Sequence, residues 1–295
     1  MQRCIFCGRT EEEFEKDNKW SEEHIIPKSL GNERFVIHNV CKYCNSGLGA
    51  YVDDYVVNNR IIQIIRQTLG LKGQSGKIPN AFSKGFDSNG KEIKVSSDFK
   101  LSKSPSIEYS DGKYRVEAAT IDEAKAILKK KMLRQGFDEG SIQNFLKDCS
   151  ISQTTIENPT VEFPFEIDIN RFHLEAVKIA YEYALYKLGE IYMDDQRAIQ
   201  IKELLFAAIN GEMINKCDDI PFVAEPPREI LDSLSKIEGS TYHLLMLFSD
   251  RENNLHACIS LFMKFSFIVL ISQNASKYNF MNPIEVICVQ KKDEN

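Results

Sequence analysis

Two cysteine pairs and a histidine between them are the residues of this chain whose types and spacing best suit chemistry. Cys4 and Cys7 are separated by two residues, and Cys41 and Cys44 repeat that spacing. Two such pairs supply the four thiolates of a closed tetrahedral zinc site. Four thiolates also ligate iron–sulfur clusters, but nothing else in the sequence indicates redox work. We therefore predict a structural zinc ion on these four cysteines.

The segment between the two pairs is long enough to hold a functional site. It contains 33 residues, whereas a simple zinc ribbon typically has about 15–20. Glu23 and His24 lie side by side within it, and Asn45 directly follows the last cysteine. A neutral imidazole, with a reference pKa of ~6.5, accepts a proton from water near neutral pH. His24 is therefore a candidate general base.

Together these residues resemble the HNH endonuclease family, the zinc-stapled branch of the ββα-metal nucleases, over about residues 1–60. The resemblance implies a phosphodiester hydrolase, with DNA as the expected substrate. It implies His24 as the general base and Glu23 and Asn45 as ligands of a catalytic Mg²⁺ or Mn²⁺ ion. Such a hard cation takes carboxylate and amide oxygens, and it would stabilise the pentacovalent phosphorane and the leaving 3′ oxygen.

The chain departs from the family pattern in two places. The family more often has aspartate at the position of Glu23, and the neighbouring Glu22 competes with it, although the two point to opposite faces of an extended strand. The family's middle asparagine, which orients the base histidine, falls on Val36 here. Asn39 is the nearest candidate for that role, with a backbone carbonyl as the alternative. Asn45 has an alternative role as a helix N-cap.

The elements that must position these residues can be read in order. Ile25 and Ile26 before Pro27 predict extended chain, a loop follows, and residues 35–37 predict a second strand. A helix is expected from Asn45 towards Leu69. This order of strand, loop, strand and helix fits a ββα-metal module. The predicted fold class is α+β, with an N-terminal ββα-metal module that carries the Cys₄ zinc site and a mixed α+β domain after it.

We predict a domain division at residue 70. Residues 1–70 form the nuclease module, residues 71–295 an accessory α+β domain of unassigned role, and residues 70–85, rich in Gly, Lys and Ser, a linker. In the accessory domain we expect strands within 91–119, a turn at Ser110–Gly112, helices at 120–134 and 141–148, a strand at 161–169, an amphipathic helix at 171–192, helices at 195–209 and 226–237, and strands at 241–249, 255–262, 265–272 and 284–290.

Charge is distributed unevenly along the chain. The net charge is −6, which excludes a uniformly basic nucleic-acid binder. Residues 71–150 carry 15 Lys and Arg against 11 Asp and Glu, whereas residues 151–295 carry 13 against 22. The first 150 residues are thus the expected DNA-binding surface, with a solvated charged face as the alternative. The acidic remainder suits a regulatory protein or ligand, or a second copy of the chain. Candidate phosphate contacts are Lys28, Lys129, Lys130 and Lys131.

Isolated polar residues elsewhere are given structural roles. His173, His243 and His256 have no metal-ligand spacing between them. Asp53 and Asp54, on the predicted helix, are expected on a solvated face, with a basic partner for Asp53 as the alternative.

The cysteines and the apolar segments bear on localisation. No apolar leader precedes Cys4, so we expect a reducing cytoplasm and metal rather than disulfides on the cysteine pairs. The apolar segment 255–272 is interrupted by His256 and Lys264. We interpret it as part of a β-hairpin rather than a membrane span, which needs about 20 apolar residues in a row.

A competing hypothesis belongs to another functional class. Two zinc knuckles would also suit a non-catalytic module that binds nucleic acid or protein. The Glu23-His24 pair favours catalysis, because a pure binding module has no need for a carboxylate that faces phosphates. The sequence leaves open DNA or RNA, any sequence preference, the oligomeric state and the pathway.

Overall fold

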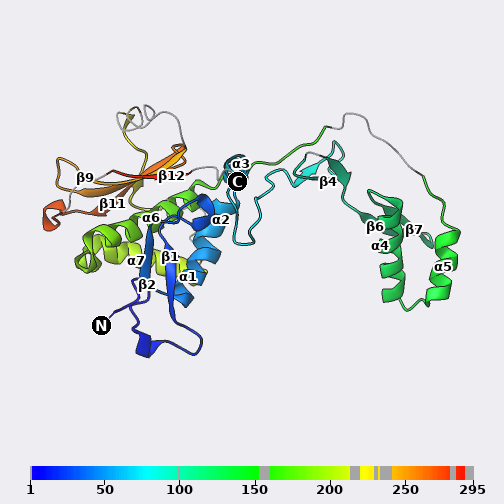
Figure 1. The fold of residues 1–295 in the computed structure, drawn as a ribbon, viewed down its shortest axis with the longest axis horizontal. Helices are drawn as coiled ribbons and strands as arrows, with labels where there is room; N and C mark the ends of the chain where they lie inside the picture. The colour runs from blue at the N-terminus through cyan, green and yellow to red at the C-terminus, as the bar shows by residue number, and fades with distance from the viewer. Residues whose placement is uncertain are drawn as a thin grey trace, which may run out of the picture. The chain divides into compact units, whose positions relative to one another are not determined.

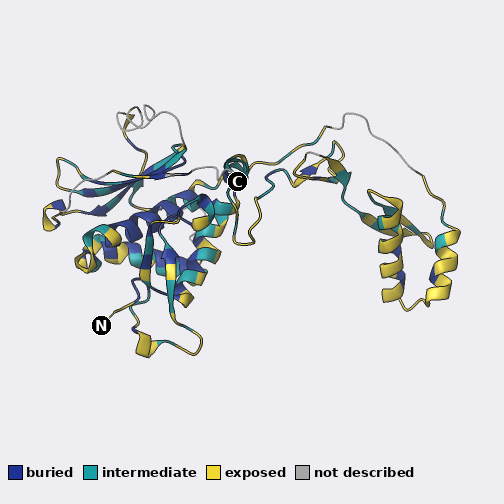
Figure 2. Cartoon of the chain, viewed as in Figure 1, coloured by how far each residue is buried: buried dark blue, intermediate teal, exposed yellow. Residues whose placement is uncertain are grey.

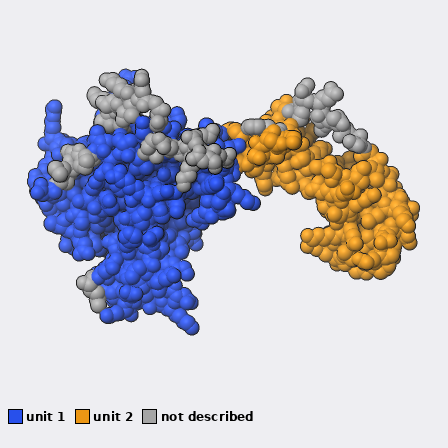
Figure 3. Space-filling model, in the orientation of Figure 1, with its two compact units in different colours: residues 1–79, 166–295 blue, residues 80–165 orange. Residues whose placement is uncertain are grey.

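The computed structural model describes residues 2–98, 100–152, 160–212, 220–228, 232, 241–279 and 284–289. The chain forms two compact units, residues 1–79 with 166–295 and residues 80–165 (Figure 3). The chain therefore leaves the first unit after residue 79 and returns to it at residue 166. This division differs from the predicted one at residue 70, because the C-terminal helices and strands share a core with the N-terminal segment.

The N-terminal part of the first unit is a short hairpin followed by helices (Figure 1). Strands β1 and β2 pair antiparallel with His24 opposite Val36, and the register shifts between Ser21 and Glu23. The predicted order of strand, loop, strand and helix is present. The elements are η1 (Glu11–Glu13), β1 (Trp20–His24), η2 (Lys28–Leu30), β2 (Val36–Cys41), α1 (Lys42–Leu48), the π-turn η3 (Gly49–Asp53), α2 (Asp54–Asn58) and α3 (Arg60–Leu69).

The predicted single helix over 45–69 is divided in the structure. It begins earlier, at Lys42, and breaks at Asn59, whose side chain accepts a hydrogen bond from the Ile61 amide at 3.1 Å. Gly47 lets α1 approach a later helix closely: a Cβ there would lie 2.6 Å from the Cγ2 atom of Ile209. Helix α1 is thus held against the C-terminal half of the unit.

The C-terminal part of the first unit is an antiparallel sheet with two helices on it (Figure 1). The strands lie in the order β12-β9-β10-β11-β8. The predicted strands at 241–249, 255–262, 265–272 and 284–290 are confirmed, and the predicted helix at 226–237 lies largely outside the described residues. The elements are α6 (Ile169–Leu188), η4 (Glu190–Asp194), α7 (Gln196–Ile209), β8 (Val223–Ala224), β9 (Tyr242–Ser249), β10 (Leu255–Leu261), β11 (Phe265–Ser272), η5 (Ala275–Lys277) and β12 (Glu285–Cys288).

Helix α6 is the centre of the core. It contacts β10 and β11 of the sheet, and it also contacts η3 and α2 of the N-terminal part. The sequence predicts an amphipathic helix here, but the structure buries it on nearly all sides (Figure 2). Its buried residues include Glu175, Lys178 and Glu182. A helix covered on two faces has no solvent side for its polar residues. Those three residues must therefore find partners inside the protein.

The second unit has its own small core. Helices α4 and α5 pack Leu128, Met132 and Ile142 against the β6–β7 hairpin. Asp111 and Gly112 form the predicted turn with φ values of 50° and 75°. The predicted strand at 161–169 is wrong, since that segment makes only an isolated bridge through residue 162. The elements are β3 (Lys84–Phe86), β4 (Glu92–Val95), β5 (Leu101–Lys103), β6 (Ser106–Ser110), β7 (Lys113–Glu117), α4 (Ile121–Arg134) and α5 (Glu139–Lys147).

The apolar segment 255–272 is a β-hairpin, as predicted. Strands β10 and β11 pair antiparallel along their length. Among the described residues, no helix has both the length and the apolar character needed to cross a membrane.

A buried histidine connects the sheet to the loop after β1. His243 on β9 is fully buried, its Nε2 lies 2.9 Å from the Leu30 carbonyl, and its Nδ1 accepts a hydrogen bond from the Phe262 amide at 3.2 Å. These partners require the neutral ring with its proton on Nε2. Burial lowers the pKa of His243 to about 4.

This histidine should make folding stability depend on pH. The unfolded chain binds a proton near pH 6.5 and the folded chain near pH 4, so protonation favours unfolding. The stabilisation is complete above about pH 6.5, and about 2 kcal/mol of it should be lost between pH 7 and pH 5. Urea unfolding at both pH values measures the loss. His243→Gln should be less stable at pH 7 but show a flatter pH dependence. An unchanged slope in the variant would contradict the assignment.

Candidate functional site

The four predicted zinc ligands lie together. The Sγ atoms of Cys4, Cys7, Cys41 and Cys44 are all within 4.8 Å of one another, and those of Cys7 and Cys41 are 3.8 Å apart. Sulfurs about 2.3 Å from a tetrahedral zinc ion are separated by about 3.8 Å. The backbone amide of Cys41 also donates to the Cys4 sulfur at 3.4 Å. The donor set and spacing fit one zinc ion, and none of these cysteines forms a disulfide.

The backbone around the first cysteine pair is fixed from two sides. The Ile5 amide donates to the Asn39 carbonyl at 3.0 Å, which ties the first pair to β2. The Ile5 carbonyl accepts from the Tyr181 hydroxyl of α6 at 2.8 Å. The zinc knuckle is thus anchored to the centre of the core.

Two of the predicted catalytic residues lie on adjoining elements. His24 is the last residue of β1 and is half-buried, and Asn45 lies on α1. The Asn45 amide nitrogen donates to the Glu22 carbonyl at 2.7 Å and to the Ser21 hydroxyl at 3.1 Å. Because a carbonyl can only accept a hydrogen bond, the atom of Asn45 that faces Glu22 must be the amide nitrogen. The other side-chain atom, Oδ1, is then left to bind a cation. The N-cap alternative for Asn45 fails, because α1 begins three residues earlier, at Lys42.

The environment of His24 favours its neutral form. Burial lowers the pKa of the imidazole, and the positive charges of Lys28 and Lys178 lower it further, whereas Glu22 and Glu33 act in the opposite direction. The ring is therefore able to accept a proton at neutral pH.

Glu23 points to the other side of the strand from the exposed Glu22. Its side chain is 5% exposed, and its Oε1 atom lies 2.7 Å from the Nζ atom of Lys178. Burial raises the pKa of Glu23 to about 7, against the opposing effect of Lys178. Asp53 of η3 lies 3.4 Å from the same ammonium, so it has the basic partner that was the alternative expectation for it.

The other predicted positions are more scattered. The register places Val36 opposite His24, and Asn39 is three residues further along β2, about 10 Å away. The structure does not bring Asn39 to His24. Lys28 is exposed four residues after His24. Lys129, Lys130 and Lys131 are exposed on α4 of the second unit, and Lys129 pairs with Glu139 at 3.4 Å.

Comparison with known protein families finds a match over the segment that holds this site. Residues 4–61 match the model of the HNH endonuclease family. The match confirms the resemblance for residues 4–61, here called the HNH module. This module includes the four cysteines, His24 and Asn45. No curated protein and no solved structure matches the chain. The family match indicates a nuclease-like function and nucleic-acid binding for the HNH module.

Two buried residues that sequence reasoning missed shape the HNH module. Asn32 is fully buried and closes the loop between β1 and β2. Its side-chain nitrogen donates to the Phe35 carbonyl, and its side-chain oxygen accepts from the Phe35 amide. The Gly31-Asn32 pair, which is typical of a turn, was the available signal in the sequence. Gly31 has a φ of 101° in the structure. Lys178 lies 155 residues after Glu23, and no local pattern links the two.

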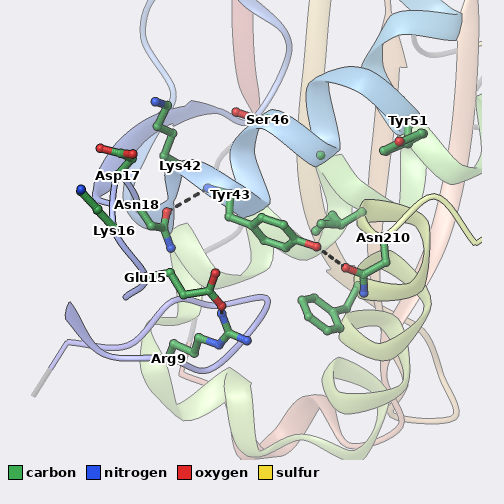
Figure 4. A pocket seen from close by; sticks show the side chains of 13 residues that line it. Arg9, Glu15, Lys16, Asp17, Asn18, Lys42, Tyr43, Ser46, Tyr51 and Asn210 are labelled. Atoms are coloured by element: carbon green, nitrogen blue, oxygen red, sulfur yellow. Dashed lines mark hydrogen bonds and ion pairs between the residues drawn. The ribbon is translucent and has the colours of Figure 1, made fainter. Parts of the chain in front are cut away.

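A hollow of about 910 Å³ lies on another side of α1 (Figure 4). The Tyr43 hydroxyl donates to the Asn210 side chain at 2.6 Å across it, and Arg9 pairs with Glu15 at 3.5 Å. The remaining charged residues there, Lys16, Asp17 and Lys42, are also of mixed sign. The hollow therefore has no strong electrostatic preference for an anionic chain.

The zinc site leads to a prediction about folding. Purified protein should carry one zinc ion per chain, and Cys44→Ser should lose it, because serine is a poor zinc ligand at neutral pH. The first unit should then fail to melt cooperatively, while the second unit, which has a separate core, stays folded. Metal analysis and calorimetry measure both effects.

Cys149→Ser is the matched control, since Cys149 is half-buried in the second unit and far in sequence from the zinc ligands. It should keep zinc and the wild-type melt. Folded, metal-free wild-type protein would contradict the assignment.

Proposed function

We propose that this protein is a metal-dependent endonuclease that hydrolyses phosphodiester bonds in DNA, with His24 as general base. The observation that carries the proposal is that the half-buried His24 ends the strand β1 to which the Asn45 amide is fixed, through the Glu22 carbonyl, within a segment that matches the HNH family. The Cys₄ cluster holds structural zinc and takes no part in the chemistry.

The proposed reaction depends on the protonation state of His24. The neutral imidazole takes a proton from water, the resulting hydroxide forms a bond to phosphorus, and the bond from phosphorus to the 3′ oxygen breaks. The leaving oxygen then takes up a proton from solvent. The lowered pKa of His24 supports this role, because it favours the neutral ring, in which one nitrogen can accept a proton.

The proposed ligands of the catalytic metal differ in how well they fit. Asn45 offers Oδ1, whereas Glu23 has one carboxylate oxygen on Lys178. Glu22 is the exposed carboxylate of β1, and its charge acts on His24. A Mg²⁺ or Mn²⁺ ion would supply a Lewis acid that stabilises charge on the phosphate. Separate Glu22→Gln and Glu23→Gln variants would decide which carboxylate supports metal-dependent cleavage.

The decisive test is plasmid nicking with Mg²⁺ or Mn²⁺ and with chelator. Removing a general base typically costs about 10²–10⁴-fold in rate, so His24→Ala should nick at least about 100-fold more slowly than the wild type. Its zinc content and melting temperature should be unchanged. His38→Ala is the matched control, because His38 is an exposed histidine on β2.

Equal nicking by His24→Ala and the wild type would place the chemistry elsewhere. DNA binding by a wild-type protein that never nicks would favour the competing hypothesis of a non-catalytic binding module.

We propose that the protein binds DNA largely independently of the DNA sequence. The exposed lysines of α4 are suited to phosphate contacts, which carry no sequence information. DNA binding should therefore weaken steeply as salt rises. Replacing Lys129, Lys130 and Lys131 together with Ala should reduce affinity and flatten the dependence on salt, measured by fluorescence anisotropy.

A control of equal charge change uses three lysines of the acidic C-terminal part, Lys202, Lys264 and Lys277. Its affinity and salt slope should match the wild type. If the α4 variant also matches the wild type across the titration, α4 is a solvated face.

A further inference from the structure

The ammonium group of Lys178 is fully buried and surrounded by oxygens. Its Nζ atom donates to the carbonyls of His24 at 3.1 Å and Ile25 at 3.4 Å. It also lies 2.7 Å from Glu23, 3.4 Å from Asp53 and 3.4 Å from Glu182. A charge taken out of water costs several kcal/mol unless it is paired and hydrogen-bonded. These oxygens provide that compensation.

The protonation of the cluster supports a lysine that stays charged. Burial lowers the pKa of Lys178, but the nearby carboxylates more than offset this and leave it raised. Burial also raises the pKa of Glu175 and of Glu182 well above the usual range. Lys178 therefore keeps its ammonium form, with three N–H donors for the surrounding oxygens.

The two carbonyls on Lys178 belong to the backbone of the candidate base and of the next residue. The β1–β2 ladder ends at the pair of His24 and Val36, and just beyond it the Ile25 amide donates to the Phe35 carbonyl at 3.1 Å. The carbonyls of His24 and Ile25 accept from Lys178. The zinc ion fixes only the two ends of the segment, at Cys4–Cys7 and Cys41–Cys44. Lys178 adds a donor from the core between these ends, because buried carbonyls need a hydrogen-bond partner.

We propose that Lys178 is a positioning residue for His24, taking the role that the HNH resemblance gives to an asparagine on the second strand. The inference rests on the proposed nuclease function. Lys178 fixes the His24 backbone to α6, which is packed between the sheet and the HNH module. Asn39 cannot substitute, because it lies about 10 Å along β2 from the residue opposite His24.

The test replaces the ammonium and keeps the side-chain stem, as Lys178→Met in the full-length protein. A displaced catalytic group costs up to about 100-fold, so kcat for plasmid nicking should fall at least about tenfold. The KM for DNA should stay within about twofold, because a fully buried lysine does not touch DNA. The matched control is Lys187→Met, the same change on the same helix, where the lysine pairs with Glu285 outside the HNH module.

A second measurement, the NMR signal of the His24 ring, does not depend on catalytic activity. The chain has five histidines, so the ring signal of His24 in ¹³C-histidine-labelled protein can be assigned by comparison with His24→Ala. Lys178→Met should shift this signal and Lys187→Met should not. If the wild type shows no nicking with any metal, the proposed function fails, while the His24 signal still decides the positioning role.

Folding is checked by zinc content and a cooperative melt. If Lys178→Met fails these checks, the double variant Lys178→Met with Glu182→Gln is measured in the same way. It removes a buried carboxylate together with the ammonium, so less charge is left unpaired. A folded variant with kcat within about twofold of the wild type, or with an unmoved His24 signal, overturns the proposal.

Discussion

The buried interaction between Lys178 and Glu23 joins the two halves of the first unit. Glu23 comes from a short hairpin, and Lys178 comes from the helix on which the C-terminal sheet packs. Removing one partner of a buried pair leaves an uncompensated charge, which typically costs about 3–5 kcal/mol. Neither half can therefore place its polar residue favourably without the other. This dependence explains why the HNH module and the residues after 166 form a single unit, although they lie far apart in sequence.

The cysteine cluster and the core provide two different kinds of constraint on the same module. A zinc ion on the four cysteines would give a hairpin of this size a local anchor that its own apolar residues are too few to provide. The core then sets the orientation of that hairpin through hydrogen bonds to backbone carbonyls, as Tyr181 does for Ile5. His243 does the same for Leu30 from the sheet. Polar side chains of the C-terminal half thus bind the backbone of the N-terminal half as well as the Glu23 and Asp53 side chains.

Features encoded by nearby residues could be predicted from the sequence. The spacing of the cysteine pairs predicts the metal cluster. The spacing of Thr120 and Glu123 is typical of a helix start, and Thr120 does cap its helix by accepting from the Glu123 amide at 3.1 Å. Features that depend on residues far apart in the sequence could not be predicted. The spacing of Glu175, Lys178 and Glu182 is also that of a solvent-exposed charged stripe, and only the packing on both sides of α6 distinguishes the two cases. The strand expected at 161–169 failed for a similar reason, since alternation of residues does not ensure a neighbouring strand.

The path of the chain through the first unit has a consequence for synthesis. Residues 80–165 separate the HNH module from α6, and at about 5–20 residues per second the ribosome needs roughly 5–20 s to translate from α3 to Lys178. During that interval the hairpin can bind zinc, but Glu23 has no lysine and the apolar face of the module has no helix to cover it. The nascent module must wait for its C-terminal partner. A ribosome that stalls within the inserted unit would thus leave the HNH module with an incomplete core.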